Sequence, residues 1–280
     1  TVDRVRDGGS FTTRRVVAIQ KGESIFTMMA SFQGDEPGYE HQAKMPDVPG
    51  PEELASDIEL LRRKADLIPE RIREKFLGAK PIEIRPVTLF DPFEPKPAEP
   101  LKYVWFRADG VMPEDPQVHK YVLAYASDFN LITTTLQPHG ASFMQRNMQM
   151  ASLDHSLWFH GNLRVNDWLL YAMDSPWAGN ARGLARGHIF TREGRLVASV
   201  AQEGLVRVRQ ARGDGLEQLQ RAPEPGTLTL QQPGERLALH QLQRSPALKR
   251  GAIERGHQVA VRAHQHHGPE ALGPPLQVGV

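Results

Sequence analysis

Three polar side chains that could do chemistry stand inside otherwise apolar segments of the sequence: Asp128, Ser152 and Gln202. The segments that carry them are YASDFNL at 125–131, MASLDHSLWFH at 150–160 and SVAQEGLVR at 199–207. A buried polar group costs free energy unless it is hydrogen-bonded. If the three segments converge in the fold, they predict a small hydrogen-bonding site made of a carboxylate, a hydroxyl and an amide.

Such a trio could activate a water molecule. Asp128 can accept a proton as a general base, and the hydroxyl of Ser152 and the amide of Gln202 can hold the water, because each donates and accepts hydrogen bonds. Each residue also has a structural interpretation, with Asp128 an exposed residue late in a helix and Ser152 an ordinary strand residue. Gln202 is in phase with Ala198 and Val200, so a regularly alternating strand places its amide on an apolar face, where it needs a partner.

A covalent serine mechanism is the minor alternative. Asp154 and His155 follow Ser152 closely, but adjacent strand residues point to opposite faces, so the two cannot both align with the serine. The sequence contains no G-x-S-x-G nucleophile motif. We therefore expect His155 and His160 to be structural, paired with Asp154 or Asp167.

The motifs SLDHSLWFH at 152–160, DSPWAG at 174–179 and AQEGLVR at 201–207 resemble those of the acyl-CoA thioesterase II family, in the family's order. The resemblance extends from Thr1 to about Arg209. It implies a double-hotdog fold and hydrolysis of acyl-CoA thioesters to free fatty acid and CoA. By motif, the family's catalytic Asp, Thr or Ser, and Gln fall on Asp128, Ser152 and Gln202. It also implies no cofactor, no metal and a homo-oligomer.

Two other functions stay open at this point. One is a truncated hotdog fragment that binds acyl-CoA but hydrolyses it weakly or not at all. The other is a hotdog hydratase, which would need a His–acid pair at the start of the helix, for which Asp115 and His119 offer little support.

The pattern of apolar residues predicts an α+β fold with one long helix packed on an antiparallel sheet. Asp115 and Pro116 form a typical helix start, as N-cap and first helical residue. The apolar stripe of this helix has a period near 3.6 and consists of Val118, Tyr121, Val122, Tyr125 and Phe129. Strands are expected near 82–87, 103–108, 147–157, 167–174, 183–191 and 195–207. The helix stripe and one face of the sheet must both be buried, and each can cover the other.

Four regions follow from this pattern. Residues 1–50 predict a partial first hotdog domain that lacks its first strand and central helix, and 51–80 a helical linker. Residues 81–209 predict the second hotdog, which carries the thioesterase site. Residues 210–280 contain none of the chain's 20 aromatic residues and are expected to be disordered. The cluster of His264, His266 and His267 in this tail could bind a metal, but we expect solvated histidines there.

The first region has the layout of part of the second. A strand, a glycine turn and a returning strand that ends at Gln33 correspond to the segment 182–202, which ends at Gln202. This repeat of layout indicates a duplicated unit.

Composition excludes several classes of function. The chain has 280 residues, no cysteine and a formal charge of +1, which rules out thiol nucleophiles and thiolate metal sites and gives no support for nucleic-acid binding. No apolar run is long enough for a membrane span, and no signal-peptide pattern opens the chain. We therefore expect a cytoplasmic enzyme whose partner is the acyl-CoA substrate.

Overall fold

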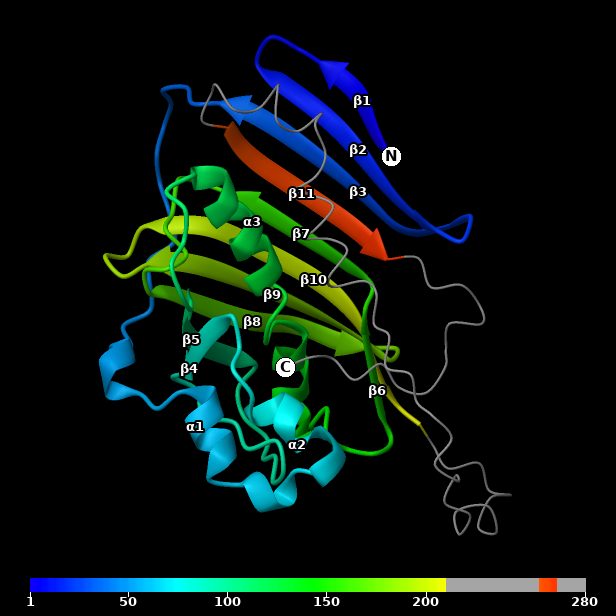
Figure 1. Ribbon diagram of the computed structural model, residues 1–280, viewed down its shortest axis with the longest axis vertical. Coiled ribbons are helices and arrows are strands. Elements are labelled where there is room, and N and C mark those ends of the chain that lie inside the picture. Colours follow the sequence, from blue (N-terminus) through cyan, green and yellow to red (C-terminus); the bar gives the residue numbers. More distant parts are fainter. Residues whose placement is uncertain (210–256, 266–280) are drawn as a thin grey trace.

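The structure, a computed structural model, describes residues 1–209 and 257–265, the latter as backbone only. Within these ranges eleven strands form a single antiparallel sheet, ordered β1-β2-β3-β11-β7-β10-β9-β8-β5-β4, with β6 paired to β10 (Figure 1). The strands are β1 (Val2–Asp7), β2 (Phe11–Gln20), β3 (Glu23–Gly34), β4 (Ile82–Pro86), β5 (Leu101–Ala108), β6 (Met148–Ser152), β7 (Asp154–Phe159), β8 (Leu169–Gly179), β9 (Arg182–Thr191), β10 (Leu196–Val208) and β11 (His257–Gln265). The helices are η1 (Pro51–Glu53), α1 (Asp57–Arg62), η2 (Ala65–Leu67), α2 (Glu70–Leu77), α3 (Pro116–Ala126) and η3 (Ile132–His139).

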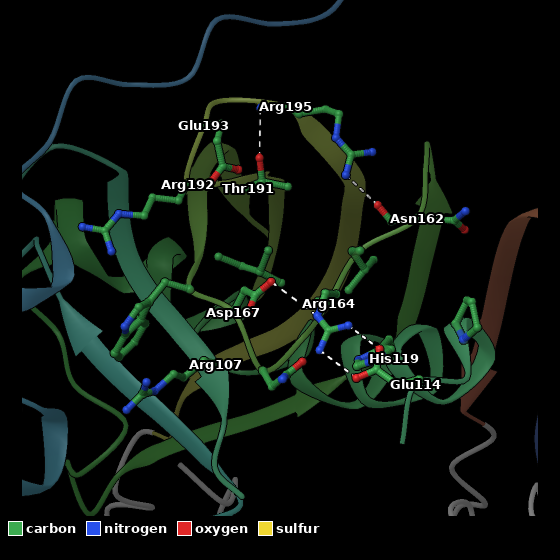
Figure 2. A pocket seen from close by; sticks show the side chains of 15 residues that line it. Arg107, Glu114, His119, Asn162, Arg164, Asp167, Thr191, Arg192, Glu193 and Arg195 are labelled. Atoms are coloured by element: carbon green, nitrogen blue, oxygen red, sulfur yellow. Dashed lines mark hydrogen bonds and ion pairs between the residues drawn. The ribbon is translucent and has the colours of Figure 1, made fainter. Parts of the chain in front are cut away.

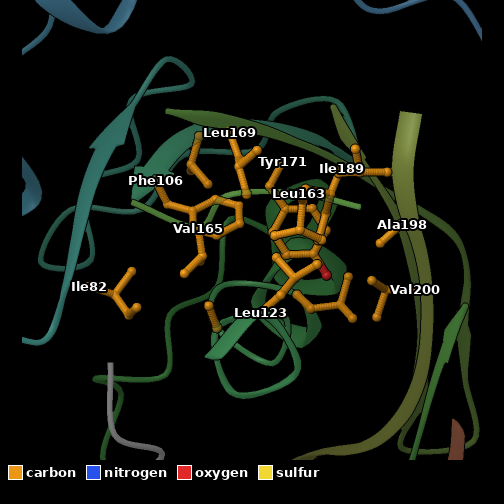
Figure 3. Close-up of a cluster of buried hydrophobic side chains, with 14 of the residues drawn as sticks. Ile82, Phe106, Leu123, Leu163, Val165, Leu169, Tyr171, Ile189, Ala198 and Val200 are labelled. Carbon is orange, nitrogen blue, oxygen red and sulfur yellow. The ribbon is translucent and has the colours of Figure 1, made fainter. Parts of the chain in front are cut away.

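The α+β prediction is confirmed: helix α3 lies across the curved sheet formed by β4 to β10 (Figure 1). Asp115 caps α3 as expected, since its carboxylate accepts from the backbone N–H of Gln117. Leu123 and Ala126 of α3 are buried against strand residues such as Ile189 and Val200 (Figure 3). The helix stripe and the inner sheet face thus bury each other, as their apolar patterns require.

The expected helix is shorter than its apolar stripe predicts. The stripe extends to Phe129, but α3 ends at Ala126 and a turn follows before η3 begins at Ile132. Asn130 in this turn has a positive φ of 67°, a left-handed conformation that interrupts a helix and that Asn tolerates better than most residues. The stripe continues to Phe129 because the turn still packs on the core.

The two ends of the sheet have mirrored layouts. Strands β1, β2 and β3 follow one another outward to inward on one side, and β8, β9 and β10 do so on the other. Between them, β11 pairs with β3 and β7 pairs with β10, and these two inner strands pair with each other. This arrangement agrees with the duplicated layout of the sequence.

Strand β11 differs from the expectation of a disordered segment over 210–280. His257–Gln265 pairs with β3 on one side and β7 on the other. The lack of aromatic residues misled the prediction, because a strand between two partners gains backbone hydrogen bonds along both edges, whatever its side chains. Its sequence also alternates, with Val259, Val261 and Ala263 two residues apart. The rest of the tail lies outside the described residues, as do His266 and His267.

The segment 35–50, which follows β3, runs over the outer face of the sheet. Met45 and Val48 of this segment pack against the buried cluster of Trp105, Leu170 and Phe190. The indole N–H of Trp105 donates to the backbone oxygen of Pro49 at 2.8 Å, which fixes the segment to the sheet. Over residues 1–209 and 257–265, none of the helices combines the length and the apolar character that crossing a membrane requires.

Candidate active site

The three side chains singled out from the sequence meet in the structure. Gln202 joins them, because its Nε2 donates to Asp128 Oδ1 at 2.6 Å and to Ser152 Oγ at 3.1 Å. The residues come from three elements that are far apart in the sequence. The separation between Asp128 and Gln202 is 74 residues, and that between Ser152 and Gln202 is 50.

Sheet pairing and a close helix approach bring these elements together. Ser152 ends β6 and pairs with Gly204 of β10, two residues beyond Gln202. A Cβ on Gly204 would lie 2.6 Å from side-chain carbons of Ile132, so only glycine lets η3 come this close to the sheet. The turn between α3 and η3, which carries Asp128, is thereby held above β10.

Gln202 is the buried member of the trio, with 1% of its surface exposed. Its amide orientation is fixed by chemistry, since the reverse orientation would place two oxygen acceptors 2.6 Å apart at Asp128. As a result Gln202 Oε1 is buried, and it has no hydrogen-bond partner among the described residues. The amide thus offers an acceptor next to a carboxylate and a hydroxyl.

Asp128 is the exposed member of the trio. Its Oδ1 accepts from Gln202. The exposed side of the carboxylate is open to a water molecule or a substrate. The bond from Gln202 fixes the orientation of the carboxylate, and a general base needs such an orientation to reach its water.

His155 is the buried titratable neighbour of this trio. Its Nε2 lies 2.8 Å from Ser127 Oγ, and its pKa is lowered by burial, an effect that the charges of Asp128 and Asp154 oppose. Its Nδ1 is buried without a hydrogen-bond partner among the described residues. His155 is therefore neutral at pH 7.

The hydrogen bonds of the two histidines go to serines. His155 Nε2 bonds Ser127 instead of Asp154, whose carboxylate accepts from the backbone N–H of Glu203. His160 Nε2 bonds Ser199 at 2.8 Å instead of Asp167.

A cleft of about 620 Å³ lies at the other end of α3 (Figure 2). Arg107, Arg164, Arg192 and Arg195 reach it, but none of the trio lines it. Arg164 pairs with Glu114, and Arg107 lies over the ring of Trp168 with its Cζ 4.5 Å from the centroid. These cations are already engaged within the protein. Across the part of the chain that the structure describes, no group of three or more His, Asp or Glu could hold a metal ion.

Comparison with known proteins gives the family. Residues 71–205 match the family model described as acyl-CoA thioesterase. The chain is 41% identical over 206 residues to acyl-CoA thioesterase 2 of Haemophilus influenzae, a match that covers 74% of this chain and 72% of that protein.

Solved structures agree with this result. The crystal structure of the acyl-CoA thioesterase II TesB2 from Mycobacterium marinum is 41% identical, with a TM-score of 0.59 over 75% of this chain and 73% of that one. A hot dog fold protein of unknown function from Alicyclobacillus acidocaldarius is 17% identical, with a TM-score of 0.57 over 75% of this chain and 72% of that one, which supports the fold alone. The fold is therefore the expected hotdog fold, and the chain belongs to the acyl-CoA thioesterase family.

Proposed function

We propose that this protein hydrolyses acyl-CoA thioesters to free fatty acid and CoA with a water activated by Asp128, Ser152 and Gln202. The observation that carries the proposal is the single amide nitrogen of Gln202 that donates to both the carboxylate and the hydroxyl. Such an arrangement brings a base, a hydroxyl and an amide together, so that one water could contact all three.

The reaction follows from these groups. Asp128 takes a proton from the water while the water oxygen bonds to the thioester carbonyl carbon. Gln202 Oε1 and Ser152 Oγ hold the water, which lowers the entropic part of the barrier. The tetrahedral intermediate then collapses with cleavage of the carbon–sulfur bond. The proton held by Asp128 passes to the leaving thiolate, so that the enzyme returns to its starting state.

We also infer the division of the chain and its assembly. Residues 81–209 are taken as a complete hotdog unit, 51–80 as the connection, and 1–50 as part of a first unit. Val5, Phe11 and Ile19 of this first part are 53–56% exposed, and a second copy of the chain would cover such apolar groups. Size-exclusion chromatography with light scattering should give the mass of a homo-oligomer. A monomer at all protein concentrations would contradict the proposed self-association.

The proposed activity is tested with the purified chain and decanoyl-CoA, using a thiol reagent to follow CoA release. The wild type should turn over, and Asp128→Asn should lower kcat by about 100-fold or more, the range for loss of a general base. Asp174→Asn is the matched control, because that carboxylate pairs with Arg186 at the far side of the sheet. Tight binding of decanoyl-CoA by the wild type without turnover would support the binding-fragment alternative and contradict the proposal.

A further inference from the structure

We propose that Ser127, Tyr171 and His155 are positioning residues that hold the peptide unit carrying Asp128, a role that rests on the proposed function of Asp128. Ser127 is fully buried, with 0% of its surface exposed, and it directly precedes the exposed carboxylate residue. It is therefore the last buried residue before the proposed base.

Tyr171 holds the backbone at this point. Its hydroxyl donates to the carbonyl oxygen of Ser127 at 2.7 Å. That carbonyl belongs to the planar peptide unit that also contains the nitrogen of Asp128. A donor on this oxygen fixes the plane from which the Asp128 side chain projects.

The Tyr171 side chain is itself immobile. It is 1% exposed and meets Phe106 edge-on, with ring centroids 6.2 Å apart. A Cβ on Gly187 would lie 2.2 Å from the Tyr171 ring, so the ring occupies space that only glycine leaves free. Burial, and after it the charge of Asp128, raises the pKa of Tyr171 well above its ordinary value, so its hydroxyl remains a donor at all working pH values.

His155 holds the same residue from strand β7. Ser127 Oγ donates to the carbonyl oxygen of Ala124 at 2.9 Å, so its single proton is already used. His155 Nε2 must then carry the hydrogen and donate to Ser127 Oγ. This tautomer makes the unpartnered Nδ1 a bare acceptor, which costs less than a buried unpartnered N–H would.

Together these bonds fix Ser127 from three directions. The backbone N–H donates to Leu123 O of α3, Tyr171 comes from β8 and His155 comes from β7. Helix α3 ends at Ala126, so these side chains hold the turn with Asp128 together with the backbone bond from Phe129 N–H to Ala126 O. A displacement of about 1 Å at a reacting group can cost about 100-fold in rate.

The experiment compares two hydrogen-bonded histidine–serine pairs, of which the control pair also has His188 Nδ1 3.0 Å from Ser199 Oγ. Tyr171→Phe, Ser127→Ala and His155→Asn are the test variants, and His160→Asn and Ser199→Ala are the controls. His160 and Ser199 are hydrogen-bonded at 2.8 Å like the test pair, but on the outer face of the sheet. Steady-state kinetics with decanoyl-CoA and thermal unfolding are measured for all five variants and for Asp128→Asn.

Each test variant should lower kcat about tenfold or more with KM changed less than about twofold, because an Asp128 that is no longer held loses alignment with its water. Tyr171→Phe keeps the ring and removes one oxygen, so it keeps the test valid if His155→Asn folds poorly. Control variants should retain kcat within about twofold. A Tyr171→Phe enzyme with wild-type kcat, or one whose kcat falls no more than that of the controls, would overturn the inference. Full activity of Asp128→Asn would instead overturn the proposed function itself.

Discussion

Replacement of Gln202 by methionine should abolish activity without unfolding the protein. Methionine has nearly the length of glutamine but neither donates nor accepts strong hydrogen bonds. In Gln202→Met, Asp128 and Ser152 both lose the Nε2 donor that joins them. The proposed water also loses the Oε1 acceptor.

The stability change is small because its parts oppose one another. Asp128 is exposed, so water replaces its lost donor at little cost, and loss of the Ser152 bond costs about 1 kcal/mol. Against this, Gln202 Oε1 is buried and unpartnered among the described residues, and removing such a group is worth about 1–3 kcal/mol. These parts cancel to within about 1–2 kcal/mol, which corresponds to a shift in Tm of a few degrees for a chain of this size.

The kinetic change is large because the reaction needs those same groups at close range. Loss of both the held water and the aligned base should lower kcat by about 100-fold or more, equivalent to roughly 3 kcal/mol of barrier. Thiol release from decanoyl-CoA gives kcat, and urea unfolding followed by circular dichroism gives the free energy of unfolding.

Gln137 supplies the matched control. It is 2% exposed, and its Oε1 is also buried without a partner among the described residues, but it lies in η3 away from the trio. Gln137→Met should therefore change stability as little as Gln202→Met and leave kcat intact. Destabilisation of Gln202→Met by more than about 3 kcal/mol would refute the reasoning about its amide oxygen, and kcat equal to that of Gln137→Met would refute the catalytic bridge.

Three further changes test other parts of the structure. Gly187→Ala should lower the free energy of unfolding by about 1–3 kcal/mol, since its Cβ would meet the Tyr171 ring at 2.2 Å. Gly38→Ala, with open space around it, is the control in urea unfolding. Equal free energies of unfolding for the two variants would contradict the close contact. Burial lowers the pKa of His155, so as the pH falls the unfolded state binds a proton before the folded state does. The free energy of unfolding should therefore decrease below about pH 6.5, by up to about 1.4 kcal/mol per pH unit. Between pH 7.5 and 5.0 this decrease should be smaller in His155→Asn than in the wild type, and an equal decrease would contradict a buried, neutral His155. Burial lowers the pKa of Lys102 to about 8, so the charged form of this side chain is costly to bury at pH 7. Lys102→Met should therefore raise the free energy of unfolding by about 1–3 kcal/mol. A destabilised variant would show that the bond from Lys102 Nζ to Thr133 Oγ1 outweighs that cost.

The sequence identified the trio because each member interrupts an apolar pattern. Gln202 is the clearest case, since its phase with Ala198 and Val200 placed an amide on the buried face, and the structure buries it there. The order and length of the motifs around Asp128 and Ser152 brought them into the same site, which the residue types alone left open.

The parts that the sequence did not reveal depend on distances between elements. Nothing in an apolar strand shows that the hydroxyl of Tyr171 meets the carbonyl of Ser127, because that contact requires the ring to fit above Gly187. The end of α3 was missed because the apolar stripe continues through Phe129. The hydroxyls of Thr133 and Thr134, which both donate to Asn130 O, stabilise the turn that ends the regular helix.

The two histidines of the motif SLDHSLWFH show how position decides what a side chain does. His155 and His160 are five residues apart, an odd spacing that sends them to opposite faces of an extended strand. Each bonds a serine at 2.8 Å, although Ser199 Oγ also lies 3.0 Å from His188 Nδ1. The serine of one pair joins the peptide unit of an exposed carboxylate, and the serine of the other belongs to strand β10. Only the first pair can transmit its rigidity to Asp128, and this difference makes the second pair a fair control for the first.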